Sequence, residues 1–219
     1  MSASSMQHAL HRVLTHPLMM AAKGPLKDAW WSARGHGLSN PPIPSAVRSI
    51  LFVCKGNICR SPFAAARAAH LFSEAGLQGV RCTSAGIIAT QAAGPPLEAC
   101  EAASAYGLEL DAHQPVQVTP QLISAHDITI VMDADQMLAL RQAYPDAAGR
   151  IFLLPLLEPG VSRGYARYNI SDPFGQPLAT FGRCYRRIDS ALRSLLRLIA
   201  HDSPQSTPRS QVAPAGARR

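Results

Sequence analysis

A cysteine and an arginine separated by five residues stand in the stretch CKGNICRS, residues 54–61. A loop of this length can curl so that its backbone N–H groups point inward and bind an anion. Gly56 and Asn57 are residue types that accept the positive φ angles which a tight curl requires. Arg60 can donate two parallel N–H bonds to two oxygens of one phosphate. The stretch therefore predicts a phosphate-binding loop with the thiol of Cys54 at its floor.

The same loop can carry nucleophilic chemistry on the bound phosphate. Arg60, the loop amides and the N-terminus of the helix that follows form a positive field, which stabilises the thiolate of Cys54. A thiolate below a bound phosphate is an in-line nucleophile, and the Ser61 hydroxyl can donate to the sulfur and help it leave later. The predicted phosphate-binding residues are Lys55, Gly56, Asn57, Ile58, Cys59, Arg60 and Ser61.

The elements around the loop follow a regular alternation. Strands are predicted at residues 47–54, 80–86, 127–133 and 150–155, and helices at 61–76, 95–107, 134–144 and 178–200. The first helix is predicted to start with Ser61 as its cap and Pro62 in its first turn, and to end at Gly76. An apolar stripe on the last helix is predicted to be core: Phe181, Tyr185, Ile188, Leu192, Leu195 and Ile199.

This alternation predicts an α/β fold. We expect a single three-layer domain with a four-stranded parallel sheet, helices on both faces and the phosphate-binding loop after the first strand. In such sheets ligands bind beyond the carboxyl ends of the strands, and residues 54–61 lie at that end of the first one. A structural cysteine followed by a surface arginine would also fit the spacing, but the strand–loop–helix context favours the phosphate site.

Two flanking segments surround the predicted domain of residues 47–202. Residues 1–46 are expected to be a partly ordered extension in which Trp30 and Trp31 pack on the domain, and 203–219 a disordered basic tail. The net charge is +7, of which each flank contributes +3. A nucleic-acid face would concentrate this charge on the folded domain instead, so no nucleic-acid partner is expected.

The cysteine usage and hydropathy indicate a cytoplasmic protein. No apolar run approaches the roughly 20 residues that span a bilayer, and the first residues do not resemble a secretory signal. The odd count of five cysteines is irregularly spaced and contains no metal-ligand pattern. We therefore expect no membrane insertion, no disulfide framework and no metal, and we interpret Cys82, Cys100 and Cys184 as small buried hydrophobes.

The sequence VCKGNICRSP resembles the signature of the low-molecular-weight protein tyrosine phosphatases. The likeness extends over about residues 47–200. Residues 83–86, Thr-Ser-Ala-Gly, match the family's Ser-Ala-Gly after its second strand, and DITIVMDADQ resembles the segment that carries its Met-Asp. NISDPFG resembles the family's general-acid loop, with Asp172 in the place of the acid.

The resemblance implies a two-step phosphatase without a cofactor. Cys54 attacks phosphorus and forms a cysteinyl-phosphate, while Asp172 protonates the leaving phenolic oxygen and then activates water. Arg60 and the loop amides hold the phosphate oxygens in both transition states. The implied substrate is a phosphotyrosine protein, with a tyrosine kinase that controls exopolysaccharide export as a candidate partner. We expect a monomer or a weak dimer.

The resemblance also implies supporting roles. Ser84 and His113 are expected to hold Asn57, and Cys59 either forms a reversible disulfide with the nucleophile or is a small buried residue. Phe174 stands after the acid's position, where eukaryotic members carry tyrosines. The loop IIATQAAG, residues 87–94, contains no aromatic residue, so one wall of the cleft is expected to be thin.

Two alternative functions remain at this stage. An arsenate reductase of the same fold would need a pair of closely spaced resolving cysteines near residues 85–100. Only Cys82 and Cys100 lie near that region, and they are too far apart in the sequence to form such a pair. A catalytically silent phosphate-binding module has no need of Cys54, Arg60 and Asp172 together.

Overall fold

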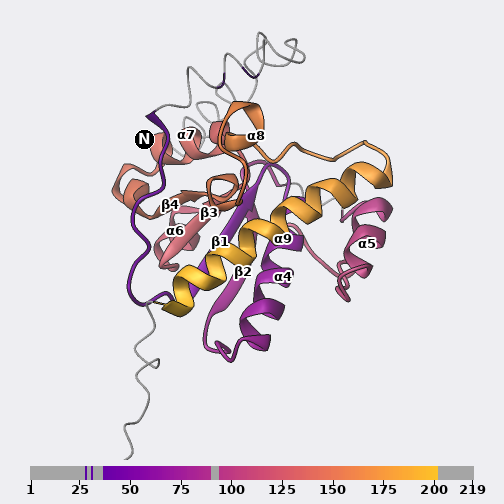
Figure 1. Cartoon of the computed structure of the whole chain (residues 1–219), viewed down its shortest axis with the longest axis horizontal. Coiled ribbons are helices and arrows are strands. Elements are labelled where there is room, and N and C mark those ends of the chain that lie inside the picture. Colours follow the sequence, from indigo (N-terminus) through magenta and orange to yellow (C-terminus); the bar gives the residue numbers. More distant parts are fainter. Residues whose placement is uncertain (1–27, 29–30, 32–36, 90–93, 202–219) are drawn as a thin grey trace, which may run out of the picture.

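A computed structural model describes residues 28, 31, 37–89 and 94–201 of the chain (Figure 1). The predicted tail at 203–219, Trp30 and most of the predicted extension lie outside the described residues. Within this part of the chain, no helix is long and apolar enough to cross a membrane.

Four parallel strands form the centre of the molecule. β1 (Ser49–Cys54) lies between β2 (Arg81–Gly86) and β3 (Ile128–Val131), and β4 (Ile151–Leu153) pairs with β3. The chain moves to one side of β1 to form β2 and then to the other side to form β3. The carboxyl end of β1 is therefore the switch point at which parallel sheets bind their ligands. The predicted four-stranded parallel sheet is confirmed, although β3 and β4 are shorter than predicted.

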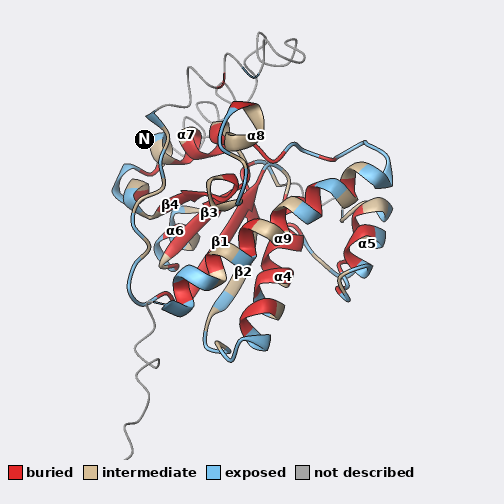
Figure 2. Ribbon diagram, in the orientation of Figure 1, coloured by how far each residue is buried: buried red, intermediate tan, exposed pale blue. Residues whose placement is uncertain are grey.

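Helices cover both faces of this sheet, which confirms the three-layer prediction (Figures 1 and 2). Ile50 and Phe52 of β1 face one hydrophobic cluster, and Leu51 and Val53 face another, because side chains alternate along a strand. The first cluster contains side chains of α4 (Arg60–Glu74), α5 (Leu97–Ser104) and α9 (Leu178–His201). The second contains side chains of α6 (Pro120–Ser124) and α7 (Ala134–Ala143).

The apolar stripe on α9 packs as the sequence predicts. The six predicted side chains are all buried: Phe181, Tyr185, Ile188, Leu192, Leu195 and Ile199. The Tyr185 ring stacks on Phe63 of α4, with centroids 3.8 Å apart and an angle of 3° between the rings. This contact joins the last helix to the helix that follows the loop.

The ends of α4 differ in how well the sequence predicted them. The prediction that Ser61 caps the helix is wrong, because α4 begins at Arg60 with Cys59 at the N-cap and no side-chain cap bond. The Ser61 hydroxyl instead contacts groups of the loop. At the other end, Gly76 has a φ of 76°, and the N–H groups of Gly76 and Leu77 donate to Ser73 and Phe72. That is the Schellman pattern, and it confirms the predicted stop at Gly76.

Four short elements were not predicted. They are α6, two 3₁₀ helices at Pro145–Arg150 and Leu154–Leu157, and α8 (Gly164–Tyr168). The Thr119 side chain caps α6 by accepting from the Leu122 N–H, 3.1 Å away, so a Thr-Pro start signal was present in the sequence. α8 offers no such signal, since Arg163 at its N-cap makes no side-chain cap bond.

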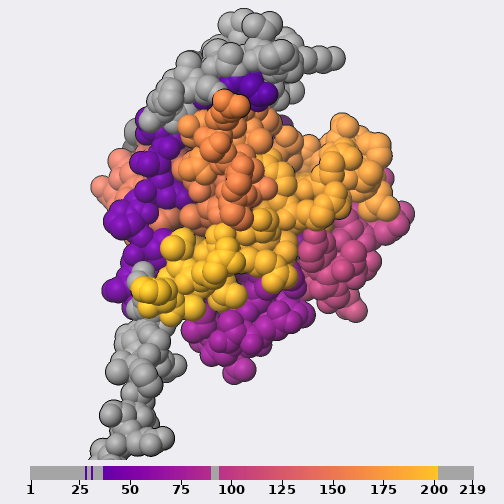
Figure 3. Space-filling view, viewed as in Figure 1, coloured from indigo at the N-terminus to yellow at the C-terminus, as the bar shows by residue number. Residues whose placement is uncertain are grey.

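Segment 37–46 lies along the edge of β4. The Asn40 side chain donates to the Leu153 carbonyl over 3.1 Å and accepts from the Leu153 N–H over 2.7 Å. These two bonds cover backbone groups that a sheet edge would leave exposed. The indigo part of the chain lies against the orange part that includes α8 (Figure 3). Trp31 is buried, with 1% of its surface exposed, and belongs to the second hydrophobic cluster.

The stacked pair of Phe63 and Tyr185 generates a stability prediction. Phe63→Ala should lower the free energy of unfolding by about 3–5 kcal/mol, because it removes a fully buried ring and leaves a cavity. Urea unfolding, followed by the midpoint at an unchanged slope, measures this change. Leu198→Ala on the same sheet face is the control, since Leu198 is 44% exposed; an equal loss in both variants would contradict the prediction.

Candidate active site

The loop of residues 54–61 begins where β1 ends and runs into α4. Cys54, with 2% of its surface exposed, is the last residue of the strand. Among the described non-glycine residues only Asn57 has a positive φ, 58°, and its residue type tolerates that conformation. The Ile87 and Ile88 N–H groups donate to the carbonyls of Cys54 and Lys55, at 2.9 and 2.8 Å. The loop is therefore tied to the end of β2 as well as to β1.

Gly86 allows the loop to approach β2 closely. A Cβ atom at this position would lie 2.9 Å from the Gly56 carbonyl carbon and 3.0 Å from the Asn57 nitrogen. Both atoms belong to the loop backbone, so they cannot move aside as a flexible side chain could. Glycine is therefore required here by its neighbours, because the loop could not keep this curl against a larger residue.

Two donors point at the sulfur of Cys54. The Asn57 N–H lies 3.3 Å from Sγ, and the Ser61 hydroxyl oxygen lies 3.0 Å from it. The Ser61 hydroxyl has one proton and two acceptors within reach, Sγ and the Ala85 carbonyl at 3.2 Å. An ionised sulfur is the stronger acceptor of the two, since hydrogen bonds to charged groups are the stronger ones.

The Asn57 side chain holds the loop from the outside. Its Nδ2 donates to the hydroxyls of Ser61 and Ser84, each over 2.9 Å, and its Oδ1 accepts from the Val116 N–H over 2.8 Å. Because a backbone N–H can only donate, the Val116 contact fixes which way the amide points. One buried side chain thus joins the loop to β2 and to the segment before α6.

His113 completes this support. Its Nε2 lies 2.9 Å from the Asn57 carbonyl oxygen and 3.2 Å from Asn57 Oδ1. Both partners accept, so the ring carries its hydrogen on Nε2. Burial lowers the pKa of His113 below its ordinary value, although the contact with Asn57 opposes this shift. Ser84 and His113 therefore both contact Asn57, the arrangement that the family resemblance implies.

Arg60 is the most constrained charge in the site. It is 2% exposed, and its Nη1 donates to Asp133 Oδ2 at 3.1 Å and to the Ile170 carbonyl at 3.0 Å. Its Nη2 pairs with Asp172 Oδ2 at 2.9 Å. Burial alone would lower the pKa of Arg60, but the carboxylates of Asp172 and Asp133 raise it above its ordinary value.

Asp133 is a site residue that the sequence analysis did not single out. It follows β3, at the same edge of the sheet as the loop, and its Oδ1 accepts from the Gln136 N–H at the start of α7 over 2.9 Å. Burial raises the pKa of Asp133, whereas Arg60 and the Gln136 N–H oppose that rise. The sequence signal was its position after a predicted strand, within the DITIVMDADQ segment.

Asp172 faces the loop from the segment between α8 and α9. Its side chain is 39% exposed, so one side meets solvent while Oδ2 reaches Arg60. The Phe174 N–H donates to its Oδ1 at 3.3 Å. The structure therefore brings together the sulfur of Cys54, the guanidinium of Arg60 and a carboxylate that solvent and substrate can reach.

The other predicted residues occupy different depths around the loop. Lys55 is exposed, Gly56 and Ile58 are half-buried, and Cys59 is 2% exposed. The Cys59 carbonyl accepts from the Tyr185 hydroxyl over 3.2 Å, a contact that the sequence analysis did not anticipate. Phe174 is 59% exposed beside Asp172. Part of the loop that was predicted to form a thin wall, residues 90–93, lies outside the described residues.

The remaining cysteines do not all match their interpretation as buried hydrophobes. All five cysteines of the chain are free thiols. Cys184 is buried on α9, and its thiol contacts the Ser171 carbonyl at 3.7 Å. Cys82 and Cys100 are only half-buried, on β2 and α5, where they pack against the edge of the first cluster.

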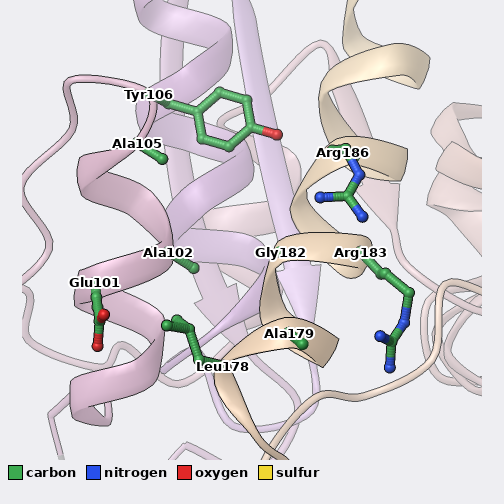
Figure 4. A pocket seen from close by; sticks show the side chains of 9 residues that line it. All are labelled: Glu101, Ala102, Ala105, Tyr106, Leu178, Ala179, Gly182, Arg183 and Arg186. Carbon is green, nitrogen blue, oxygen red and sulfur yellow. The ribbon is translucent and has the colours of Figure 1, made fainter.

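A groove of about 570 Å³ lies between α5 and α9, away from the loop residues (Figure 4). Its floor consists of small residues, and the side chains of Arg183 and Arg186 lie along its α9 side. None of the residues that line it contacts the Cys54 sulfur. The groove is therefore separate from the chemical site.

Comparison with known proteins gives one family. The family model described as low molecular weight phosphotyrosine protein phosphatase matches residues 49–205. The probable low molecular weight protein-tyrosine-phosphatase EpsP of Ralstonia nicotianae is 33% identical over 135 residues, which are 62% of this chain and 84% of that protein.

Two further relatives broaden the comparison. A protein-arginine-phosphatase of Geobacillus stearothermophilus is 30% identical over 151 residues, 69% of this chain and 93% of its own. The solved structure of Wzb from Vibrio vulnificus in complex with benzylphosphonate is 29% identical in sequence and superposes with a TM-score of 0.60. The match covers 69% of this chain and 99% of the Wzb chain.

The close approach at Gly86 generates a prediction about anion binding. Gly86→Ala should weaken the binding of inorganic phosphate by roughly tenfold. This factor corresponds to the loss of one hydrogen bond to a charged group, about 1.5 kcal/mol. The physical cause is the displacement of the Gly56–Asn57 backbone by the new methyl group. Isothermal titration calorimetry measures the affinity. Gly79→Ala is the matched control, because a Cβ at Gly79 meets nothing within 4 Å; unchanged phosphate affinity in Gly86→Ala would contradict the account.

Proposed function

The chain belongs to the low molecular weight phosphotyrosine protein phosphatase family, and we propose that it hydrolyses phosphotyrosine in proteins through a cysteinyl-phosphate on Cys54. The observation that carries this proposal is the convergence of three groups at the end of β1. They are the sulfur of Cys54 with its two donors, the buried guanidinium of Arg60, and the accessible carboxylate of Asp172.

In the first step the Cys54 thiolate attacks phosphorus and the S–P bond forms as the bond to the phenolic oxygen breaks. The electron pair of that bond goes to the oxygen, which takes a proton from Asp172. Arg60 Nη2 now pairs with Asp172. A phosphate oxygen that takes over this nitrogen would free the Asp172 carboxylate, which would take up a proton from solvent and turn toward the leaving group. Substrate binding would in this way be coupled to the acid function of Asp172.

In the second step a water molecule attacks the phosphorus of the cysteinyl-phosphate. Asp172, now ionised, removes a proton from that water, and the sulfur leaves as a thiolate. The Ser61 hydroxyl, 3.0 Å from Sγ, donates to the sulfur as its negative charge returns. The loop N–H groups and Arg60 hold the phosphate oxygens in both steps, so the same preorganised field serves each transition state.

Phosphoarginine in proteins is a second candidate substrate. The relative from Geobacillus stearothermophilus that matches 69% of this chain is a protein-arginine-phosphatase. Attack of a thiolate on phosphorus and proton transfer to the leaving atom would serve a P–N bond as well as a P–O bond. A comparison of kcat/KM for phosphotyrosine and phosphoarginine peptides of the same sequence decides between them, and a higher value for phosphoarginine would overturn the proposed substrate.

The proposed partner is a protein tyrosine kinase whose phosphorylation this enzyme reverses, in the control of exopolysaccharide export that the family resemblance implies. We propose the cytoplasm as its compartment, because catalysis requires a reduced Cys54, and reducing conditions keep thiols free there.

The roles of the nucleophile and the acid can be tested with two substitutions. Cys54→Ser should abolish turnover of p-nitrophenyl phosphate but still bind phosphate, because the loop amides and Arg60 remain. Asp172→Asn should lower kcat by roughly 10²–10⁴-fold, the usual contribution of general acid–base catalysis. Asp146→Asn, at an exposed carboxylate in the 3₁₀ helix before β4, is the control and should leave kcat unchanged. Substantial turnover by Cys54→Ser would show that another residue is the nucleophile.

The proposed guard role of Cys59 has its own test. Peroxide should oxidise the Cys54 thiolate to a sulfenic acid, and the Cys59 thiol should then condense with it, releasing water and forming a disulfide. Burial raises the pKa of Cys59, which favours its neutral thiol form in the folded loop. Wild type should regain activity with dithiothreitol, whereas Cys59→Ser should regain much less. Equal recovery, with no linked Cys54–Cys59 peptide in mass mapping, would assign Cys59 to packing alone.

A further inference from the structure

Two residues before the family match contact the segment that carries the proposed acid. The family model begins at residue 49, yet Asp28 and Trp31 contact residues of α8. We use the name acid-bearing segment for residues 164–172, which comprise α8 and the four residues up to Asp172. The family's own sequence pattern therefore does not account for everything that holds this segment.

Asp28 binds the first turn of α8. Its Oδ1 accepts from the Tyr165 N–H over 2.8 Å. Arg163, at the N-cap of α8, makes no side-chain cap bond, so the carboxylate of Asp28 takes the place of a local cap. Gly164 has a φ of 74°, and a Cβ there would lie 2.9 Å from Asp28 Oδ1. The start of α8 thus has room for the Asp28 carboxylate and for little else.

Trp31 packs on the aromatic side chains of α8. Its ring meets Tyr165 edge-on and stacks on Tyr168, each at a centroid distance of 6.1 Å. With 1% of its surface exposed, Trp31 is among the largest fully buried side chains in the described part of the chain. Burial of an indole ring is a large stabilising contribution. Trp31 therefore fixes the positions of both tyrosines against the second hydrophobic cluster.

Tyr165 connects this packing to the acid. Its hydroxyl accepts from the Ser171 hydroxyl over 3.4 Å, and Ser171 precedes Asp172. The intervening residues are held at the sheet: the Ile170 N–H donates to the Met132 carbonyl over 2.9 Å, and the Ile170 carbonyl accepts from Arg60. The acid-bearing segment is thus held by the sheet at Ile170 and by Trp31 through Tyr165.

We propose that Asp28 and Trp31 are positioning residues of the active site, which hold the acid-bearing segment so that Asp172 can protonate the leaving group. The inference rests on the proposed function, because it assigns a role to residues that act through the acid of that function. Neither residue touches the substrate. Their effect passes through Tyr165 and Ser171, so it should fall on proton transfer and leave the phosphate-binding loop intact.

The dependence on the leaving group separates this role from a merely structural one. A p-nitrophenolate leaves readily without a proton, whereas phenolate needs one, so a misplaced acid harms phenyl phosphate more. The quantity kcat/KM reports the step in which the cysteinyl-phosphate forms and the phenol departs. A general loss of folded protein would lower kcat/KM for both esters by the same factor.

The experiment compares the wild-type chain of 219 residues with its Trp31→Ala and Asp28→Ala variants. In both variants the ratio of kcat/KM for p-nitrophenyl phosphate to kcat/KM for phenyl phosphate should rise, by roughly tenfold in Trp31→Ala, since a misplacement of about 1 Å can cost 10²-fold. Trp31→Phe should restore much of the wild-type ratio because it keeps an aromatic ring beside Tyr165. Tyr165→Phe keeps the ring and removes the hydroxyl. It should also raise the ratio, and so it tests the contact between Tyr165 and Ser171.

Asn40→Ala is the matched control, because Asn40 also lies before the family match but bonds to β4 and not to α8. It should keep the wild-type ratio. Inhibition by inorganic phosphate should be unchanged in every variant that folds, since no loop residue is replaced and Ile170, which binds Arg60, is still held by the Met132 carbonyl. If Trp31→Ala does not fold, Asp28→Ala and Tyr165→Phe carry the test.

The measurements distinguish a failure of the proposed function from a failure of the positioning role. A wild-type protein that hydrolyses neither ester would contradict the proposed function. An active wild type whose Asp28, Trp31 and Tyr165 variants lose activity equally on both esters would overturn the positioning role and leave the proposed function standing.

Discussion

The burial of the Arg60 guanidinium is the constraint on which the rest of the site depends. A charged group with 2% of its surface exposed is stable only if opposite charges and acceptors surround it. Asp133, which follows β3, supplies one of them, and the Ile170 carbonyl and Asp172 of the acid-bearing segment supply the others. The guanidinium that we propose to bind phosphate therefore also holds Asp133 and the proposed acid, Asp172.

The curl of the loop is the second constraint, and the structure meets it with backbone contacts and one amide. Asn57 supplies the positive φ, two donors to serine hydroxyls and an acceptor for Val116 N–H. Gly86 supplies the space beside it. Because these contacts come from the ends of β1 and β2 and from the segment before α6, the curl of the loop depends on the assembled sheet. A substitution that disturbs the ends of these strands should therefore also disturb the loop.

Much of this arrangement could be predicted from the sequence, and the reason is that the signals were local. The loop motif, the alternation of strand and helix and the α9 stripe each depend on neighbouring residues or on a regular period. Ser61 was misread because Ser before Pro signals a helix cap, whereas here its hydroxyl serves the sulfur of Cys54. Asp133 and Gly86 were missed as site residues because their roles depend on which strand ends meet. α8 carries no start signal, since its first-turn N–H is bound by Asp28, far away in sequence.

The two halves of the site differ in what holds them, and this difference is the reason why we propose that the acid, Asp172, depends on contacts from outside the sheet. Cys54 and Arg60 belong to β1 and α4, whose side chains share one hydrophobic cluster. Asp172 belongs to no strand or helix, and its side chain is 39% exposed. Proton transfer still requires its carboxylate within hydrogen-bond reach of the leaving atom. Arg187 of α9 binds the carbonyls of Ala166 and Asn169 on one side of this segment, while Asp28 and Trp31 bind α8 from the N-terminal part of the chain. A carboxylate that must move between Arg60 and a leaving group is useful only when the backbone that carries it is held in place. In the proposed mechanism these contacts hold that backbone together with the contact between Ile170 and Met132.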